Sequence, residues 1–228
     1  LTRRQITTRT ADSYVQVAQR TASLNRRIEL REGAHSTAEH DPQVEHFYEV
    51  VRKQYKQGFR KDQIVRSAFE SMVTATQTRF YPFIATLFRV LGFDAAASRP
   101  GDNGARWDAI IVDEVDSIPI EIKSPTEEQH ISLKAIRQAL ENKVILLSRK
   151  THPTRVRTTS LAVGYYLPND RAEVTNLLLD FKTTYGFSIG VIDLETLLKI
   201  AVSIVVDGST FDRKALIELE GFADVSLK

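Results

Sequence analysis

Residues 107–123 read Trp-Asp-Ala-Ile-Ile-Val-Asp-Glu-Val-Asp-Ser-Ile-Pro-Ile-Glu-Ile-Lys, a pattern typical of a β-hairpin. Residues 107–112 predict a β-strand, the polar run at 113–116 predicts a tight turn, and the alternation of isoleucine over 117–123 predicts a second strand. If the hairpin turns through its two middle residues, Asp108 lies directly opposite Glu121. Opposed residues project from one face with Cβ atoms about 5 Å apart, and residues i and i+2 share a face, so Lys123 joins them.

This predicted face brings together two carboxylates and one lysine. Carboxylate oxygens suit a hard divalent cation, so Asp108 and Glu121 are candidate ligands of Mg²⁺, with Mn²⁺ as a substitute. The backbone carbonyl of Ile122 lies between the two strand side chains and is a further candidate ligand. A bound cation can polarise a phosphoryl oxygen and activate a water, and Lys123 can stabilise charge that develops on the phosphate. The alternative interpretation is a solvated charged face on an exposed hairpin.

Helical and strand patterns alternate around the hairpin. Apolar residues at helical spacing predict helices over 44–55, 64–72, 83–91, 133–147, 174–181 and 194–206. Short apolar runs predict further strands over 161–166 and 187–192. Pro82 is expected in the first turn of the helix that Gly92 ends. This alternation indicates an α/β protein, and we expect a central mixed sheet flanked by helices.

The N-terminal quarter differs from the rest of the chain. We predict a helical N-terminal extension or linker over 1–65, with a first helix opening at Asp12 or Ser13, and a main domain over 66–228. Residues 1–66 hold 13 Lys+Arg and 8 Asp+Glu, so the net charge of +2 for the whole chain averages a basic start with a slightly acidic body. The small net charge is therefore no argument against a nucleic-acid partner.

Composition excludes several classes of protein. The 228 residues contain no cysteine, which rules out a disulfide scaffold, a Cys-ligated zinc site, an iron–sulfur cluster and a thiol nucleophile. No run of about 20 apolar residues is present, so we expect no membrane span. No apolar segment typical of a signal peptide follows the polar first residues. A cytoplasmic, prokaryotic location is the expectation.

The hairpin motif and its setting resemble the PD-(D/E)xK nuclease superfamily, with Trp107 in the place of the motif's proline. The resemblance covers roughly residues 66–166 and implies a restriction-endonuclease-like core. Carried over by residue, Asp108 and Glu121 would bind metal, Lys123 would be the catalytic lysine, and Glu70 would be a third acidic group from the first core helix. The implied activity is Mg²⁺-dependent hydrolysis of DNA phosphodiester bonds that leaves a 5′-phosphate.

A longer stretch, from about residue 66 to the C-terminus, resembles the cleavage domains of FokI-like type IIS restriction endonucleases. Residues 78–123, 162–166 and 190–198 are similar to the corresponding strands and helices, and 210–217 would match a final short helix. This implies the cleavage domain or subunit of a type II restriction enzyme that acts on double-stranded DNA. Because two strands need two cuts, a homodimer or a partner recognition subunit is the implied assembly.

Six cations are candidate contacts to DNA phosphates, namely Arg99, Arg106, Arg149, Lys150, Arg155 and Arg157. Their other interpretation is a solvated polar linker. Two alternatives to a restriction enzyme stay open. One is a related nuclease of transposition, junction repair or phage defence, and the other is a non-catalytic DNA-binding relative.

Overall fold

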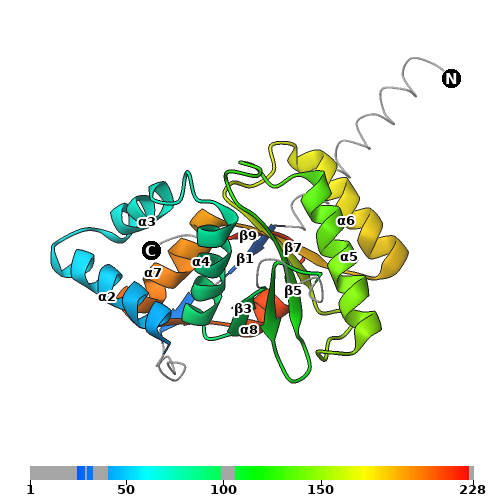
Figure 1. Cartoon of the computed structure of the whole chain (residues 1–228), viewed down its shortest axis with the longest axis horizontal. Helices are drawn as coiled ribbons and strands as arrows, with labels where there is room; N and C mark the ends of the chain where they lie inside the picture. Colours follow the sequence, from blue (N-terminus) through cyan, green and yellow to red (C-terminus); the bar gives the residue numbers. More distant parts are fainter. Residues whose placement is uncertain (1–24, 29, 33–40, 99–105, 226–228) are drawn as a thin grey trace, which may run out of the picture.

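The computed structural model describes residues 25–28, 30–32, 41–98 and 106–225, and the statements below concern these residues. A central mixed sheet runs through the molecule with helices on both faces (Figure 1). It has seven strands in the order β1 (Asn25–Arg27), β9 (Gly221–Asp224), β7 (Ile189–Asp193), β6 (Ser160–Gly164), β5 (Ile118–Lys123), β4 (Ala109–Val112) and β3 (Asp94–Ala97). The last three strands are antiparallel neighbours, and the other neighbours pair in parallel. The predicted α/β class with a central mixed sheet is confirmed.

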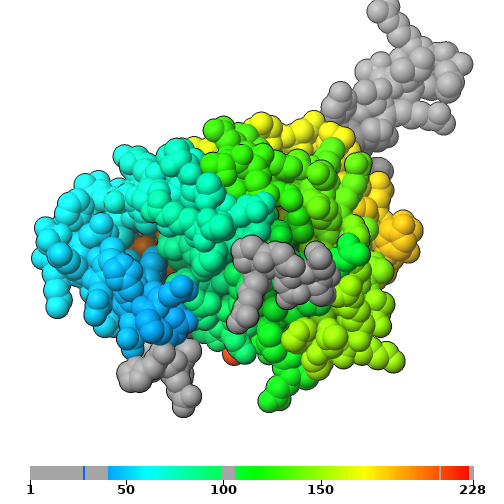
Figure 2. Space-filling view, viewed as in Figure 1, coloured from blue at the N-terminus to red at the C-terminus, as the bar shows by residue number. Residues whose placement is uncertain are grey.

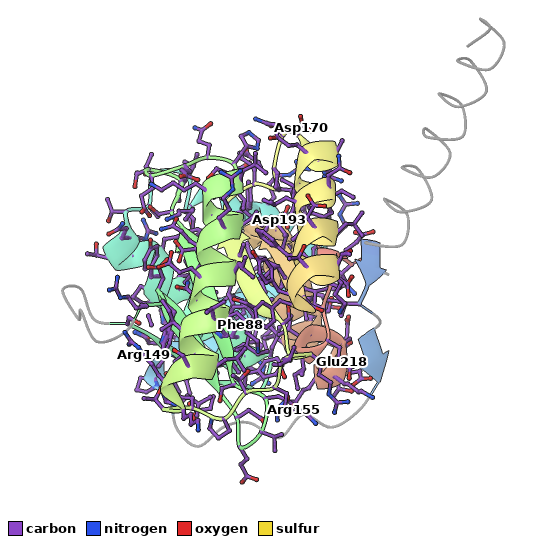
Figure 3. The ribbon with its side chains drawn as sticks, turned by 90° about the vertical axis from the view of Figure 1, so that its right-hand side faces the viewer. Phe88, Arg149, Arg155, Asp170, Asp193 and Glu218 are labelled. Carbon is purple, nitrogen blue, oxygen red and sulfur yellow. The ribbon has the colours of Figure 1, made fainter. Side chains whose placement is uncertain are left out.

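The two faces of the sheet are covered by different helices. One face packs against α4 (Gln77–Val90) and α7 (Leu194–Asp207), on which α2 (Pro42–Lys56) and α3 (Lys61–Glu70) pack in turn, and these four helices contribute to the larger core. The other face packs against α5 (Leu133–Arg149) and α6 (Arg171–Tyr185). Since the central strands are covered on both sides, every residue of β5 is buried. Figure 3 views the molecule from the side of α5 and α6.

The N-terminal region is not helical throughout its described part. β1 pairs in parallel with β9, and β2 (Leu30–Glu32) pairs with β8 (Ser209–Phe211) in a separate two-stranded sheet. Both partners come from the C-terminal end of the chain, so the expected helical extension over 1–65 needs correction. The helix α3 also spans the expected boundary between residues 65 and 66. The helix predicted at Asp12 or Ser13 lies outside the described residues.

Two further elements differ from their sequence-based bounds. α4 begins at Gln77, so Pro82 lies inside the helix rather than in its first turn. A proline at that depth lacks the N–H that would bond the carbonyl four residues earlier, that of Thr78. At the C-terminal end, the short helix α8 (Arg213–Ile217) is preceded by the strand β8. No helix within the described residues is long and apolar enough to cross a membrane.

Candidate active site

The hairpin of β4 and β5 has the register that the sequence predicts. Ala109 pairs with Ile120 and Ile111 with Ile118, so the next position places Asp108 opposite Glu121. The turn is set locally, because Oδ1 of Asp113 accepts hydrogen bonds from two backbone N–H groups further along the turn, 3.0 Å and 2.9 Å away.

The backbone of Asp108 is fixed from both sides. Its N–H donates to the carbonyl of Ile120 in β5 at 3.0 Å, and its carbonyl accepts from the N–H of Ser98, just after β3, at 2.8 Å. The side chain is held as well, since the N–H of Ile122 donates to Asp108 Oδ2 at 2.8 Å. The carboxylate therefore has a defined position just before the first residue of β4.

Glu121 and Lys123 are buried and joined to each other. Lys123 Nζ lies 2.8 Å from Glu121 Oε1, and the side chain of Asn142 in α5 donates to Glu121 Oε2 at 2.9 Å. The exposed fractions of Glu121 and Lys123 are only 4% and 9%. Because α5 covers this face of the sheet, the alternative of a solvated charged face is wrong. Sequence analysis did not identify Asn142, because no local pattern in a helix predicts which strand residue a given side chain will contact.

Burial and charge together change how easily these groups ionise. Burial, followed by the negative charge of Glu121, raises the pKa of Asp108 to about 7, although the Ile122 N–H and Lys123 act in the opposite direction. Burial disfavours the charged form of Lys123, but the hydrogen bond and charge of Glu121 outweigh it and raise the pKa of Lys123. The site thus holds a charged lysine beside a carboxylate that ionises reluctantly.

A third carboxylate, that of Glu127, belongs to the same neighbourhood. Its oxygens accept hydrogen bonds from Gln77 at 2.6 Å and Tyr81 at 3.0 Å in α4, and from the Ser124 hydroxyl at 2.7 Å. Burial opposes ionisation of Glu127, but these hydrogen bonds hold its pKa below the usual value. Its charge contributes to the raised pKa of Asp108. The sequence carried one signal for it, because Ser124-x-x-Glu127 has the spacing at which a glutamate bonds back to a serine backbone N–H, observed at 3.0 Å.

The donor atoms fit a hard divalent cation. Asp108 and Glu121 offer carboxylate oxygens from opposed strand positions. The N–H of Ile122 points toward Asp108, and in an extended strand the carbonyl of the same residue points to the same side, beyond the last residue that β4 pairs. Burial, and after it the charge of Glu121, raises the pKa of Asp108, and a bound cation would favour its ionised form. Within the described residues, no group of three or more His, Asp or Glu side chains gathers as a ready cluster of metal ligands.

Glu70, the expected third acid, occupies another place. It is the exposed last residue of α3 and lines a separate cavity with Tyr165, Tyr166 and Glu195. None of Asp108, Glu121 and Lys123 lines that cavity. The acid that the structure does bring toward the site is Glu127.

The candidate DNA contacts fall into three groups. Arg99 lies outside the described residues. Four of them are exposed, namely Arg106, Arg149, Lys150 and Arg157. Arg149 is the last residue of α5 (Figure 3), and Lys150 is its C-cap residue. Arg155 instead makes a two-point ion pair with buried Asp116, whose other hydrogen-bond donor is the Thr158 hydroxyl. This arrangement gives Arg155 a structural partner within the chain.

No protein-family model, curated protein or solved structure matches this chain. What the site can do is therefore argued from its own geometry and chemistry.

Proposed function

We propose that the chain is a Mg²⁺-dependent deoxyribonuclease with a restriction-endonuclease-like core, acting as the cleavage domain or subunit of a type II, type IIS-like restriction enzyme. The observation that carries this proposal is the placement of Asp108 opposite Glu121, with Lys123 buried against Glu121. Buried charged groups with a strongly perturbed pKa are more typical of functional sites than of ordinary surface hairpins. The substrate is double-stranded DNA.

Each residue of the trio has a distinct task in this proposal. Asp108 and Glu121 would hold the cation, and the Ile122 carbonyl would offer a further oxygen. Bound Mg²⁺ supplies Lewis-acid activation of the scissile phosphate and of a water. Lys123 would place its ammonium beside the phosphate oxygens, where it would offset charge that develops during the displacement. Asn142 keeps the carboxylate of Glu121 in place throughout.

The direct test is cleavage of a supercoiled plasmid with Mg²⁺ by the parent chain and by Asp108→Ala and Lys123→Ala. We expect each variant to lose at least a hundredfold in rate. Lys134→Ala is the matched control, because Lys134 is an exposed lysine on α5. Glu70→Ala, tested beside them, separates Glu70 from the trio. Equal cleavage by the parent and both trio variants would refute the assignment of the site.

Mapping of the cleaved ends distinguishes the biological role. Cuts at a fixed offset from one asymmetric sequence support the type IIS-like interpretation. Cuts that depend on branched or nicked structure support a nuclease of junction repair or transposition. A chain that binds Mg²⁺ and DNA but leaves every substrate intact supports the non-catalytic relative. Because one site cuts one strand, we further propose a homodimer or a partner subunit for double-strand cleavage.

A further inference from the structure

A second cavity lies away from the candidate active site, between α2, α3 and α4. Its volume is about 610 Å³, within the range of small-molecule sites. In the space-filling view it is a hollow among the blue, cyan and teal helices, with the orange of α7 visible at its floor (Figure 2).

The three helices form a closed triangle around this cavity. The turn 57–60 joins α2 to α3, and the turn 71–76 joins α3 to α4. The third corner is held by side chains, since Gln43 of α2 accepts hydrogen bonds from Thr86 at 3.0 Å and Arg89 at 2.7 Å, both in α4. Arg89 also pairs with Asp41 at the start of α2, at 2.5 Å. Because connections enclose the cavity at all three corners, it suits a compact molecule better than a helix or strand of a partner protein, which would extend past its edges.

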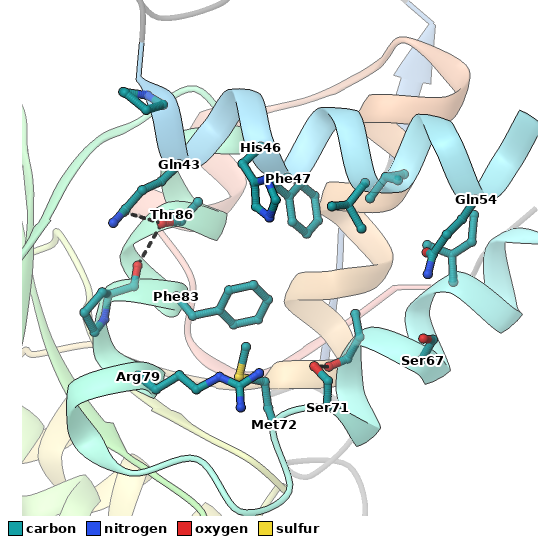
Figure 4. Close-up of a pocket in the computed structure, with 16 residues that line it drawn as sticks. Gln43, His46, Phe47, Gln54, Ser67, Ser71, Met72, Arg79, Phe83 and Thr86 are labelled. Carbon is teal, nitrogen blue, oxygen red and sulfur yellow. Dashed lines mark hydrogen bonds between the residues drawn. The ribbon is translucent and has the colours of Figure 1, made fainter.

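The wall of the cavity is mainly apolar and contains aromatic rings. Phe47 and Phe83 face the cavity with ring centroids 6.4 Å apart and a tilt of 57°, and Met72 lies beside them (Figure 4). A compact ring system can contact both phenyl rings and the thioether at once. The wall therefore favours the apolar ring body of a ligand.

One cation at this cavity is available to a ligand. Arg79 of α4 lines the cavity and is exposed, and its guanidinium makes no hydrogen bond or ion pair with any residue that the structure describes. His46 of α2 lies toward the other side of Phe83 (Figure 4). No acidic side chain lines the cavity in the described part of the chain. This charge pattern suits a ligand with one anionic group.

We propose that this cavity binds a compact, apolar ring carboxylate, whose ring packs on Phe47, Phe83 and Met72 and whose carboxylate pairs with Arg79. The site is independent of the proposed nuclease activity. α4 separates the two, because Gln77 and Tyr81 bond to Glu127 of the candidate active site, whereas Arg79 and Phe83 line the cavity.

The chain provides its own reporter for this binding. Met72 is the only methionine of the printed sequence and lines the cavity, so its ¹³C-labelled methyl group gives an NMR signal that Met72→Leu identifies by removing it. The probes are 2-naphthoate and the neutral 2-naphthylmethanol, which share one ring body. We expect naphthoate to shift this signal saturably and to bind at least tenfold more tightly than the alcohol.

Three variants locate the site. We expect Arg79→Gln to weaken naphthoate binding about tenfold and leave the alcohol unchanged. Ser67→Trp fills the cavity from the exposed side of α3 and abolishes binding of both probes. Arg66→Gln, a neighbouring cation on α3 that lines the other cavity, is the matched control and changes neither. A thermal unfolding midpoint for each variant verifies folding. The proposal is overturned if naphthoate leaves the Met72 signal unshifted, or binds Arg79→Gln and the parent equally.

Discussion

Lys123 Nζ lies 2.8 Å from Glu121 Oε1, and both side chains are almost completely buried beneath α5. A lysine and a glutamate in this position stabilise each other only as a pair, because either charge alone would be costly away from water. A divalent cation at Glu121 would compete with the lysine for the same carboxylate. In the proposed nuclease, metal binding at Glu121 would therefore weaken this pair and leave the ammonium of Lys123 available to a phosphate.

The first prediction concerns the loss of Lys123. We expect Lys123→Met to lower the free energy of unfolding in EDTA by about 2 to 4 kcal/mol, because the buried carboxylate of Glu121 keeps only Asn142 as a partner. Urea unfolding measures the change, and Lys134→Met is the exposed control. Added Mg²⁺ should recover much of the loss in Lys123→Met. An unfolding free energy equal to that of the parent would contradict a stabilising pair.

The second prediction concerns Asp108 and pH. Because its folded pKa of about 7 exceeds the usual value, ionised Asp108 costs stability, and this cost grows as pH rises from about 4 to 7. In EDTA at pH 8, we expect Asp108→Asn to be more stable than the parent by up to about 4 kcal/mol, and at pH 4 the two should be similar. Urea unfolding at both pH values is the measurement. With Mg²⁺ at a hundredfold excess over Kd, only the parent should gain about 2.7 kcal/mol. A difference that stays constant with pH would argue against a perturbed Asp108.

The third prediction assigns a positioning role to Asn142. Its amide donates to Glu121 Oε2 at 2.9 Å, so Asn142→Leu leaves that oxygen without its partner. We expect Mg²⁺ affinity to fall about 10- to 100-fold, as for other groups that orient metal ligands, while cleavage at saturating Mg²⁺ recovers. Calorimetry and cleavage rates across a Mg²⁺ series separate the two effects, with Glu141→Ala on the exposed side of α5 as control. A purely structural role would lower both quantities without recovery.

The fourth prediction separates two neighbouring arginines. Arg155 is paired with Asp116, so Arg155→Gln should lower the thermal unfolding midpoint. Exposed Arg157 is a candidate phosphate contact, and Arg157→Gln should weaken duplex binding and reduce the slope of log K against log salt by about 1. Anisotropy of a labelled duplex in an Asp108→Asn background measures binding without cleavage. An unchanged salt slope in Arg157→Gln would remove that residue from the interface.

The fifth prediction uses buried Lys143, whose ammonium donates to Thr154 and to the Arg155 carbonyl, each at 2.7 Å. Burial lowers the pKa of Lys143 to about 8, so the folded chain binds fewer protons than the unfolded chain between about pH 8 and 10.5. Stability from this group therefore rises with pH across that window. Relative to Lys143→Met, the parent should gain up to about 3 kcal/mol from pH 7 to pH 10 in urea unfolding. An equal difference at both pH values would contradict the lowered pKa.

The central hairpin was predictable because its information is local. Apolar runs of fixed length and an Asx turn at Asp113 set the register, and the register alone places Asp108 opposite Glu121. The long helices around the sheet follow from apolar periodicity for the same reason. The predicted start of α4 was wrong because proline is most common in the first turn of a helix, whereas Pro82 lies in the interior of α4.

The rest depends on partners that are distant in the sequence. β1 and β2 have three residues each, too few for a periodic pattern, and they form only because they pair with β9 and β8. Helix packing brings three further side chains to the site, those of Asn142, Gln77 and Tyr81. No spacing in the sequence predicts these contacts. Local sequence patterns therefore predict the positions of Asp108, Glu121 and Lys123, but not the side chains that hold them in place.

The parallel pairing of β1 with β9 joins residues 25–27 to residues 222–224, so one edge of the sheet is made from the two ends of the described chain. A ribosome delivers the first of these strands almost two hundred residues before the second. The hairpin that carries Asp108, Glu121 and Lys123 can form early, but the sheet cannot be completed until β9 has been synthesised. During synthesis, the hairpin of the candidate active site can therefore form before the fold is complete. Removal of β9 should leave β1 without its partner in the sheet.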